Sequence, residues 1–204
     1  MFINKTGIRF YAGFPFVAVA AFFFVTGMFK NYMCCILFSF FHEIGHLIPL
    51  LLSGVRVKEI SLGAFGIRII KNDISLSYKT ECVAALCGPF VNMIFLFVFS
   101  VLKNYNEIFI LPFNINSGLF IINLLPVRIL DGGRFIKNLL LVFYDEARVY
   151  RIMLSAELIT SVFLVFVLIF TLITDIVNTS YIFFVSALVI IIVLGIIKGE
   201  KYTH

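Results

Sequence analysis

Six apolar segments dominate this sequence, and they constrain the fold more than any other feature. Each approaches or reaches the roughly 20 residues that an α-helix needs to cross a hydrocarbon core about 30 Å thick. The segments are residues 10–29, 32–52, 82–102, 108–130, 158–174 and 181–197. They predict an all-α polytopic membrane protein with about six transmembrane helices, built as a single domain over residues 1–204.

The charged residues support a membrane protein and indicate its orientation. Only 13% of the residues are charged, whereas a soluble domain carries roughly 25%. The net charge of +5 would suggest nucleic acid in a soluble protein. Here the basic residues lie in short segments between apolar runs, so we expect no nucleic-acid partner. With the N-terminus inside, only Lys30 and Lys103 of the 16 Lys and Arg residues lie outside. The positive-inside rule therefore predicts a multi-pass protein of the cell membrane with both termini cytoplasmic.

Three stretches differ from a plain apolar helix. Residues 55–78 partly alternate apolar and polar side chains, which predicts two or three short strands in a small membrane-associated sheet after the second helix. Residues 134–151 are typical of an amphipathic connector. The fourth segment is interrupted by Pro112, Pro126 and several polar residues. These residues interrupt a helix, and non-helical backbone is tolerated inside a membrane only where protein or a water-filled cavity surrounds it.

Ionisable groups are rare in the apolar segments, and they cluster in the second one. His42, Glu43 and His46 form an HExxH motif there. On a helix, residues four apart share one face, so both imidazoles can reach one ion while Glu43 contacts a metal-bound water. The donor set favours one Zn²⁺ per chain, with a third protein ligand and water in the fourth position. A chance match is the alternative, and we expect it rarely in a membrane segment.

The third ligand is expected to be a carboxylate, and Asp131 is the candidate because it lies in a broken apolar segment. Its alternative interpretation is a helix-ending turn, since Asp-Gly-Gly is also ordinary turn chemistry. Zinc would lower the pKa of its bound water toward about 7, and Glu43 would act as the catalytic base. Asn92 and Asn123 are candidate donors to the developing oxyanion, or alternatively hydrogen-bond between helices.

Three motifs resemble those of the site-2 proteases, a family of intramembrane zinc metalloproteases. They are His42–His46, Gly88-Pro89-Phe90-Val91-Asn92, and the stretch from Asn123 to Gly132, which is similar to the family's NxxPxPxLDG signature. Their order resembles the six-helix, sporulation-type bacterial members without an added regulatory domain. The resemblance implies His42, His46 and Asp131 as zinc ligands and Asn123 and Pro126 as residues that hold substrate. Arg128 stands where the signature has its second proline.

These features predict an intramembrane zinc endopeptidase that cuts within or next to transmembrane segments of membrane proteins, near the cytoplasmic side. The partners are the lipid bilayer and a transmembrane substrate, with regulation by a membrane partner or by a prior cut in the substrate. One alternative is a transporter or channel with a buried His/Asp ion site. Another is an inactive relative that binds transmembrane segments without cutting them. A transporter has no need of Glu43, and an inactive relative would be expected to lack a ligand or the glutamate.

Overall fold

The computed structural model describes residues 2–3, 9–63, 66–72, 76–174 and, in the C-terminal segment, 185–186, 189–190, 192–193 and 196. The chain falls into two compact units, residues 1–124 and 125–204. Most of the predicted sixth helix, residues 181–197, lies outside the described residues. The prediction of a single domain stays a prediction.

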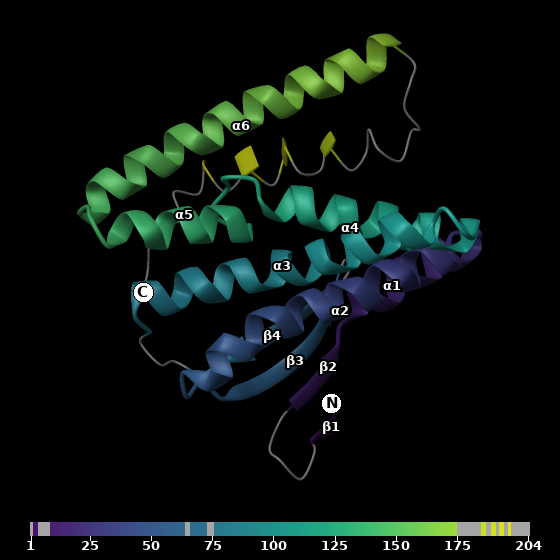
Figure 1. Cartoon of the computed structure of the whole chain (residues 1–204), viewed down its shortest axis with the longest axis horizontal. Coiled ribbons are helices and arrows are strands. Elements are labelled where there is room, and N and C mark those ends of the chain that lie inside the picture. The colour runs from purple at the N-terminus through teal and green to yellow at the C-terminus, as the bar shows by residue number, and fades with distance from the viewer. Residues whose placement is uncertain are drawn as a thin grey trace. The chain divides into compact units, whose positions relative to one another are not determined.

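Helices form most of the first unit (Figure 1). They are α1 (Phe14–Val25), α2 (Phe29–Leu52), α3 (Tyr78–Leu102), the short 3₁₀ helix η1 (Glu107–Phe109) and α4 (Ile110–Asn123). Helices α2 and α3 pack along each other, and α4 packs on α3. Phe38 of α2 contacts Phe95 and Phe99 of α3 edge-on, with ring centroids 5.1 and 5.5 Å apart. These aromatic contacts bury apolar area between the two helices that carry the histidines and the Gly-Pro motif.

The first predicted helix is shorter than residues 10–29. Strand β2 occupies Arg9–Ala12, and α1 begins only at Phe14. Pro15 favours a helix start here. The N–H groups of the first helical turn have no partner within the helix, so the N–H that proline lacks is not missed there. The helix ends before Gly27, whose φ of +73° favours glycine. At 12 residues α1 is about 18 Å long, which is shorter than a hydrocarbon core.

Helix α2 ends in a Schellman motif after its 24 residues. Gly54 adopts a φ of +84°, and the N–H of Val55 donates to the carbonyl of Leu50 at 3.1 Å. Val55 and Leu50 are also packed together in a buried apolar cluster with Ala84 of α3. This hydrophobic contact is the one that commonly accompanies the motif, so the local sequence and the tertiary packing end the helix at the same place.

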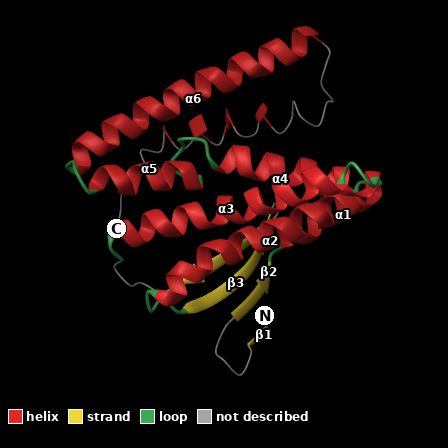
Figure 2. Ribbon diagram, in the orientation of Figure 1, coloured by secondary structure: helices red, strands yellow, loops and turns green. Residues whose placement is uncertain are grey.

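A four-stranded sheet accompanies the helices of the first unit (Figure 2). Its order is β1 (Phe2–Ile3), β2 (Arg9–Ala12), β3 (Val57–Gly63) and β4 (Gly66–Lys71). β3 and β4 form an antiparallel hairpin within the predicted strand region 55–78, which confirms the predicted short strands. β2 pairs in parallel with β3, a pairing that the local residue pattern does not predict. β4 packs against α2, so the sheet lies beside the helix that carries the HExxH motif.

Two predicted helix boundaries differ in the structure. α3 begins at Tyr78 because the Ser77 side chain caps it by accepting from the N–H of Thr80 at 3.2 Å. The predicted fourth helix, residues 108–130, is divided, since α4 ends at Asn123. Pro126 supplies no N–H, and residues 124–130 form turns in which Leu130 N–H donates to Val127 O at 2.8 Å.

The second unit contains α5 (Asp131–Leu141) and α6 (Glu146–Thr174). The predicted connector, residues 134–151, is therefore most of α5 joined to the start of α6. Val127 packs with Leu164 of α6 and with Val185 and Ile192 in one buried cluster. This cluster anchors the segment before α5 to α6.

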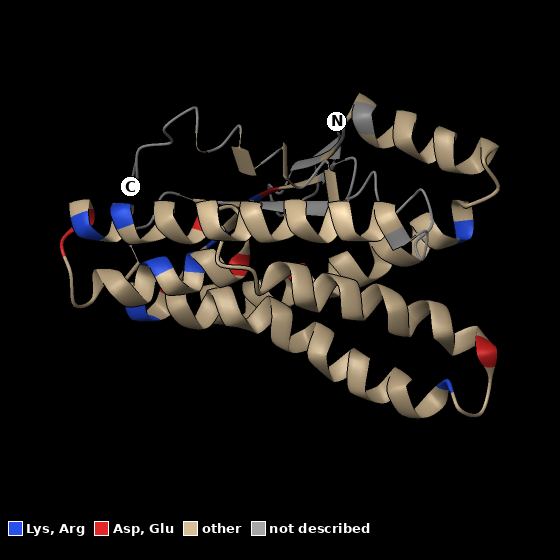
Figure 3. Ribbon diagram, turned by 90° about the horizontal axis from the view of Figure 1, so that it is seen from above, with Lys and Arg blue, Asp and Glu red and all other residues tan. Residues whose placement is uncertain are grey.

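Three described helices are long and apolar enough to cross a membrane: Phe29–Leu52, Tyr78–Leu102 and Glu146–Ile173. Shorter apolar helices cover Phe16–Val25 and Glu107–Asn123. The charged residues Lys79, Glu81 and Lys103 lie at or just beyond the two ends of α3. Most of the helical ribbon in Figure 3 is likewise uncharged. The structure thus supports a multi-pass membrane protein, as predicted.

Candidate metal centre

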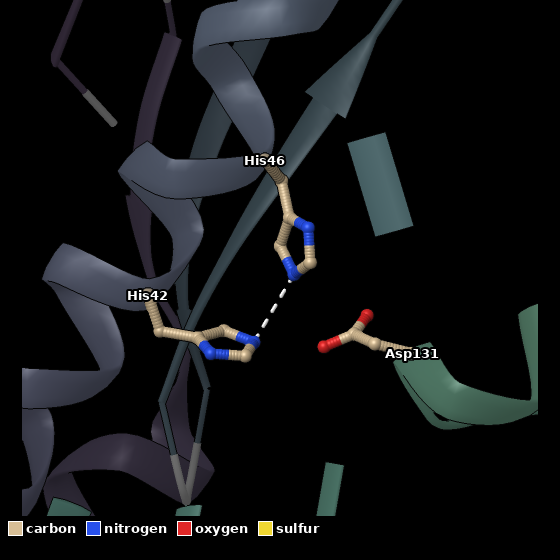
Figure 4. A group of neighbouring side chains, drawn as sticks. All are labelled: His42, His46 and Asp131. Carbon is tan, nitrogen blue, oxygen red and sulfur yellow. Dashed lines mark hydrogen bonds between the residues drawn. The ribbon is translucent and has the colours of Figure 1, made fainter. Parts of the chain in front are cut away.

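His42 and His46 lie one turn apart on the same face of α2, as their spacing predicts. Both are buried, with 6% and 8% of their surface exposed. Their Nε2 atoms face each other at 3.1 Å, and the rings are nearly perpendicular (Figure 4). Two ring nitrogens that converge in this way can bind a single cation.

The backbone of α3 determines the tautomer of His46. Its Nδ1 atom lies 2.7 Å from the carbonyl oxygen of Ala84. A carbonyl oxygen only accepts, so Nδ1 carries the proton and donates it to Ala84. The lone pair of neutral His46 is therefore on Nε2, which faces His42. A metal-binding histidine has this arrangement when its other nitrogen donates to a backbone carbonyl.

Asn92 of α3 contacts the other histidine. Its side chain is fully buried, and Nδ2 lies 3.1 Å from His42 Nδ1. Among the described residues, Asn92 Oδ1 has no hydrogen-bond partner. If the amide is turned by 180°, Oδ1 accepts from His42 Nδ1–H, and the lone pair of His42 moves to Nε2. Both Nε2 lone pairs then face each other, and they repel unless a cation accepts both. In the turned orientation Asn92 Oδ1 gains a partner and both Nε2 atoms can bind one cation, which fits a bound metal. Without a metal, the opposite orientation lets Asn92 Nδ2 donate to His42 Nδ1 and His42 Nε2–H donate to His46 Nε2.

Two glycines allow α2 and α3 to approach this closely. A Cβ on Gly88 would lie 2.3 Å from His46 Nε2 and 2.9 Å from His42 Cε1. A Cβ on Gly45 would lie 2.6 Å from the carbonyl oxygen of Cys87. Real Cβ atoms do not make such contacts, so these positions require glycine because the opposing atoms leave no room for a side chain. The space beside the two imidazoles is kept by the absence of a Cβ on Gly88.

The other predicted site residues lie on three helices and in one turn segment. Glu43 follows His42 on α2 and is half-buried. Asn123 is the last residue of α4, and Pro126 lies in the turns that follow. Asp131 is the first residue of α5, in the second unit, and Arg134 Nη1 lies 3.6 Å from its Oδ1. The structure therefore brings together His42, His46 and Asn92. The roles of Glu43, Asn123, Pro126 and Asp131 stay predictions.

Two groups that contact the residues discussed above were not predicted from the sequence. The carbonyl of Ala84 has no side-chain signature, so only the packing of α3 against α2 reveals it. Glu157 of α6 is 3% exposed and binds Arg128. The sequence does contain an indication that Glu157 is special, because it is a single acidic residue directly before the apolar run from Leu158.

Comparisons with known proteins add a sequence relative and a fold. No protein-family model matches the chain. It is 27% identical over 128 residues to stage IV sporulation protein FB of Bacillus subtilis (strain 168). That match covers 60% of this chain and 44% of the relative, so the chain spans less than half of that protein's length. Among solved structures, the fold matches the site-2 protease from Methanocaldococcus jannaschii with a TM-score of 0.63. The match covers 100% of this chain and 95% of the other chain. The sequence identity is 16%, so the two proteins are alike in fold.

Proposed function

We propose that this chain belongs to the site-2 protease family and is an intramembrane zinc endopeptidase, which hydrolyses peptide bonds within or next to transmembrane segments of membrane proteins. The observation that carries the proposal is the pair of buried Nε2 atoms of His42 and His46, 3.1 Å apart. Ala84 and Asn92 engage the two Nδ1 atoms behind them. Paired imidazoles held in this way on an apolar helix are costly without a ligand.

The proposed ligand set is His42, His46 and Asp131, and it would hold one zinc per chain. Two imidazole nitrogens and one carboxylate oxygen are a donor set of catalytic zinc sites. Asp131 offers the carboxylate oxygen and begins a helix directly after the broken segment. When bound, zinc supplies a polarised water molecule as the nucleophile.

Glu43 is proposed as the general base. Its carboxylate takes a proton from the attacking water and returns it to the leaving amine nitrogen of the cleaved peptide. The buried histidines beside it exclude bulk water, so charge that develops at the scissile carbonyl is weakly screened. We propose Asn123 and Pro126 as residues that hold the substrate next to this site.

We also propose the orientation in which both termini and the strand region are cytoplasmic. Lys and Arg residues support it, since all but Lys30 and Lys103 lie on the inner side in that orientation. Cleavage would then occur near the cytoplasmic side of a transmembrane substrate. Regulation would come from a membrane partner or from a prior cut in the substrate.

Metal removal tests this function. The full-length protein, purified in detergent, should contain about one zinc per chain by elemental analysis. Treatment with a chelator should reduce cleavage of co-reconstituted single-span membrane proteins to background, and added zinc should restore it. Metal-free protein that conducts ions in proteoliposomes would instead support the transporter. Zinc-loaded protein without cleavage of any protein in the panel would support a non-cutting relative.

Asn92 is expected to orient His42 rather than to bind the oxyanion, and its variants separate the two roles. Asn92→Ala should weaken zinc binding by about 10- to 100-fold, because His42 loses the acceptor that holds its tautomer. Asn92→Asp should keep the affinity, since a carboxylate accepts from Nδ1–H equally well. An oxyanion role needs the amide N–H, so it predicts that the Asp variant keeps zinc but loses cleavage. Zinc affinity by competition with a chromophoric chelator, together with initial cleavage rates, distinguishes these results.

A further inference from the structure

Arg128 and Glu157 form a buried ion pair in the second unit. Neither residue is one of the proposed zinc ligands. The side chains are 10% and 4% exposed. Oε1 of Glu157 accepts from the backbone N–H of Arg128 at 2.8 Å and from its Nε at 2.7 Å, and Oε2 accepts from Nη2. One carboxylate thus binds both the backbone and the side chain of Arg128. Removal of either partner would leave a buried charge uncompensated.

The pair restrains the segment that leads to Asp131. Tyr150 and Glu157 are seven residues apart on α6, and the guanidinium of Arg128 lies 5.4 Å from the Tyr150 ring centroid. Arg128 therefore contacts one face of α6 at two points. Its neighbour Val127 is buried against Leu164 of the same helix. Residues 127 and 128 are consequently anchored to α6 by both apolar and ionic contacts.

Asp131 follows this anchor at a short, constrained distance. The N–H of Leu130 donates to Val127 O at 2.8 Å. A Cβ on Gly133 would lie 2.0 Å from the same carbonyl oxygen, so the first turn of α5 is in direct backbone contact with the anchored segment. A displacement at Arg128 is therefore transmitted to the start of α5, where Asp131 lies.

We propose that Arg128 and Glu157 are positioning residues, which hold Asp131 in place for metal binding; this rests on the proposed zinc site. The backbone N–H of Arg128 is part of the restraint, and a proline at this position could not donate it. A proline would restrain the segment differently, through its fixed φ. Both the ion pair and a proline ring would limit the motion of this segment. In this chain the ion pair to α6 provides that restraint.

Four variants test the positioning role. Arg128→Met and Glu157→Leu, made singly, should each weaken zinc binding by about 10- to 100-fold, as loss of a supporting contact does. Arg128→Pro combined with Glu157→Leu should recover the affinity to within about threefold, because the ring restores the restraint and leaves no orphaned N–H. Arg148→Met is the control, since Arg148 lies exposed on the same helix and should not change zinc binding.

The readouts separate positioning from stability. Zinc affinity is measured on the folded protein, and Co²⁺-substituted samples give a visible spectrum that reports the ligand field. Thermal unfolding is measured in parallel. Single variants that unfold at lower temperature but bind zinc with the parent affinity and spectrum would overturn the inference. A double variant as weak in zinc binding as the single ones would overturn it as well.

Asp131→Asn shows which proposal has failed. Loss of zinc in this variant, with parent-like binding in the Arg128 and Glu157 variants, leaves the zinc site intact and removes only the positioning role. Parent-like zinc binding by Asp131→Asn would instead contradict the ligand set on which the positioning role depends.

Discussion

Glu43→Gln should keep about one zinc per chain and lose cleavage by about 10²- to 10⁴-fold. Glutamine has nearly the shape of glutamate, so α2 and the two histidines beside it should be unchanged. A carboxamide cannot take a proton from the attacking water or return it to the leaving amine. The expected result is therefore a folded, metal-loaded protein whose chemical step is slow.

The measurement compares zinc content and initial cleavage rate in the parent and the variant. Glu107→Gln is the matched control, because it makes the same change at an exposed residue of η1 and should leave both quantities unchanged. A Glu43→Gln protein that cleaves at the parent rate would exclude Glu43 as the base. Loss of zinc together with activity would assign Glu43 to metal binding or to the structure of the site.

Gly88→Ala should strongly weaken zinc binding while α2 and α3 remain folded. The added Cβ would lie 2.3 Å from His46 Nε2 and 2.9 Å from His42 Cε1, so both rings must turn away. Turning would break the bond between His46 Nδ1 and Ala84 O and would remove the lone pairs from the gap between the rings. We expect the zinc affinity to fall by about 100-fold or more, since both histidine ligands move.

Gly118→Ala is the control for Gly88→Ala. Both glycines lie in helix interiors, where alanine is favoured by roughly 0.5–1 kcal/mol, so both changes carry the same gain in helix propensity. No heavy atom lies within 4 Å of a Cβ on Gly118 among the described residues. Zinc content, cleavage rate and thermal unfolding are measured on both variants. A Gly88→Ala protein with parent-like zinc and activity would place the metal away from the His42–His46 gap.

The helices were predictable where they depend on length and apolar composition, and less so where tertiary contacts end them. Three of the predicted segments correspond to α2, α3 and α6, with ends shifted by caps such as Ser77. The hairpin β3–β4 was predicted from alternation, whereas β2 was read as the start of a helix. Strand β2 has a partner about 50 residues away in sequence, and local patterns do not contain such pairings.

The sequence by itself determined that His42 and His46 share one helix face, because a period of about 3.6 residues leaves no other arrangement for residues four apart. It also determined the membrane class, because segments this apolar cannot all be buried in a chain of 204 residues. Only the tertiary structure decided what stands behind those histidines. Ala84 and Asn92 lie 38 and 50 residues from their histidine partners, and Glu157 lies 29 residues from Arg128. Contacts at such separations depend on how helices pack, which local residue patterns do not encode.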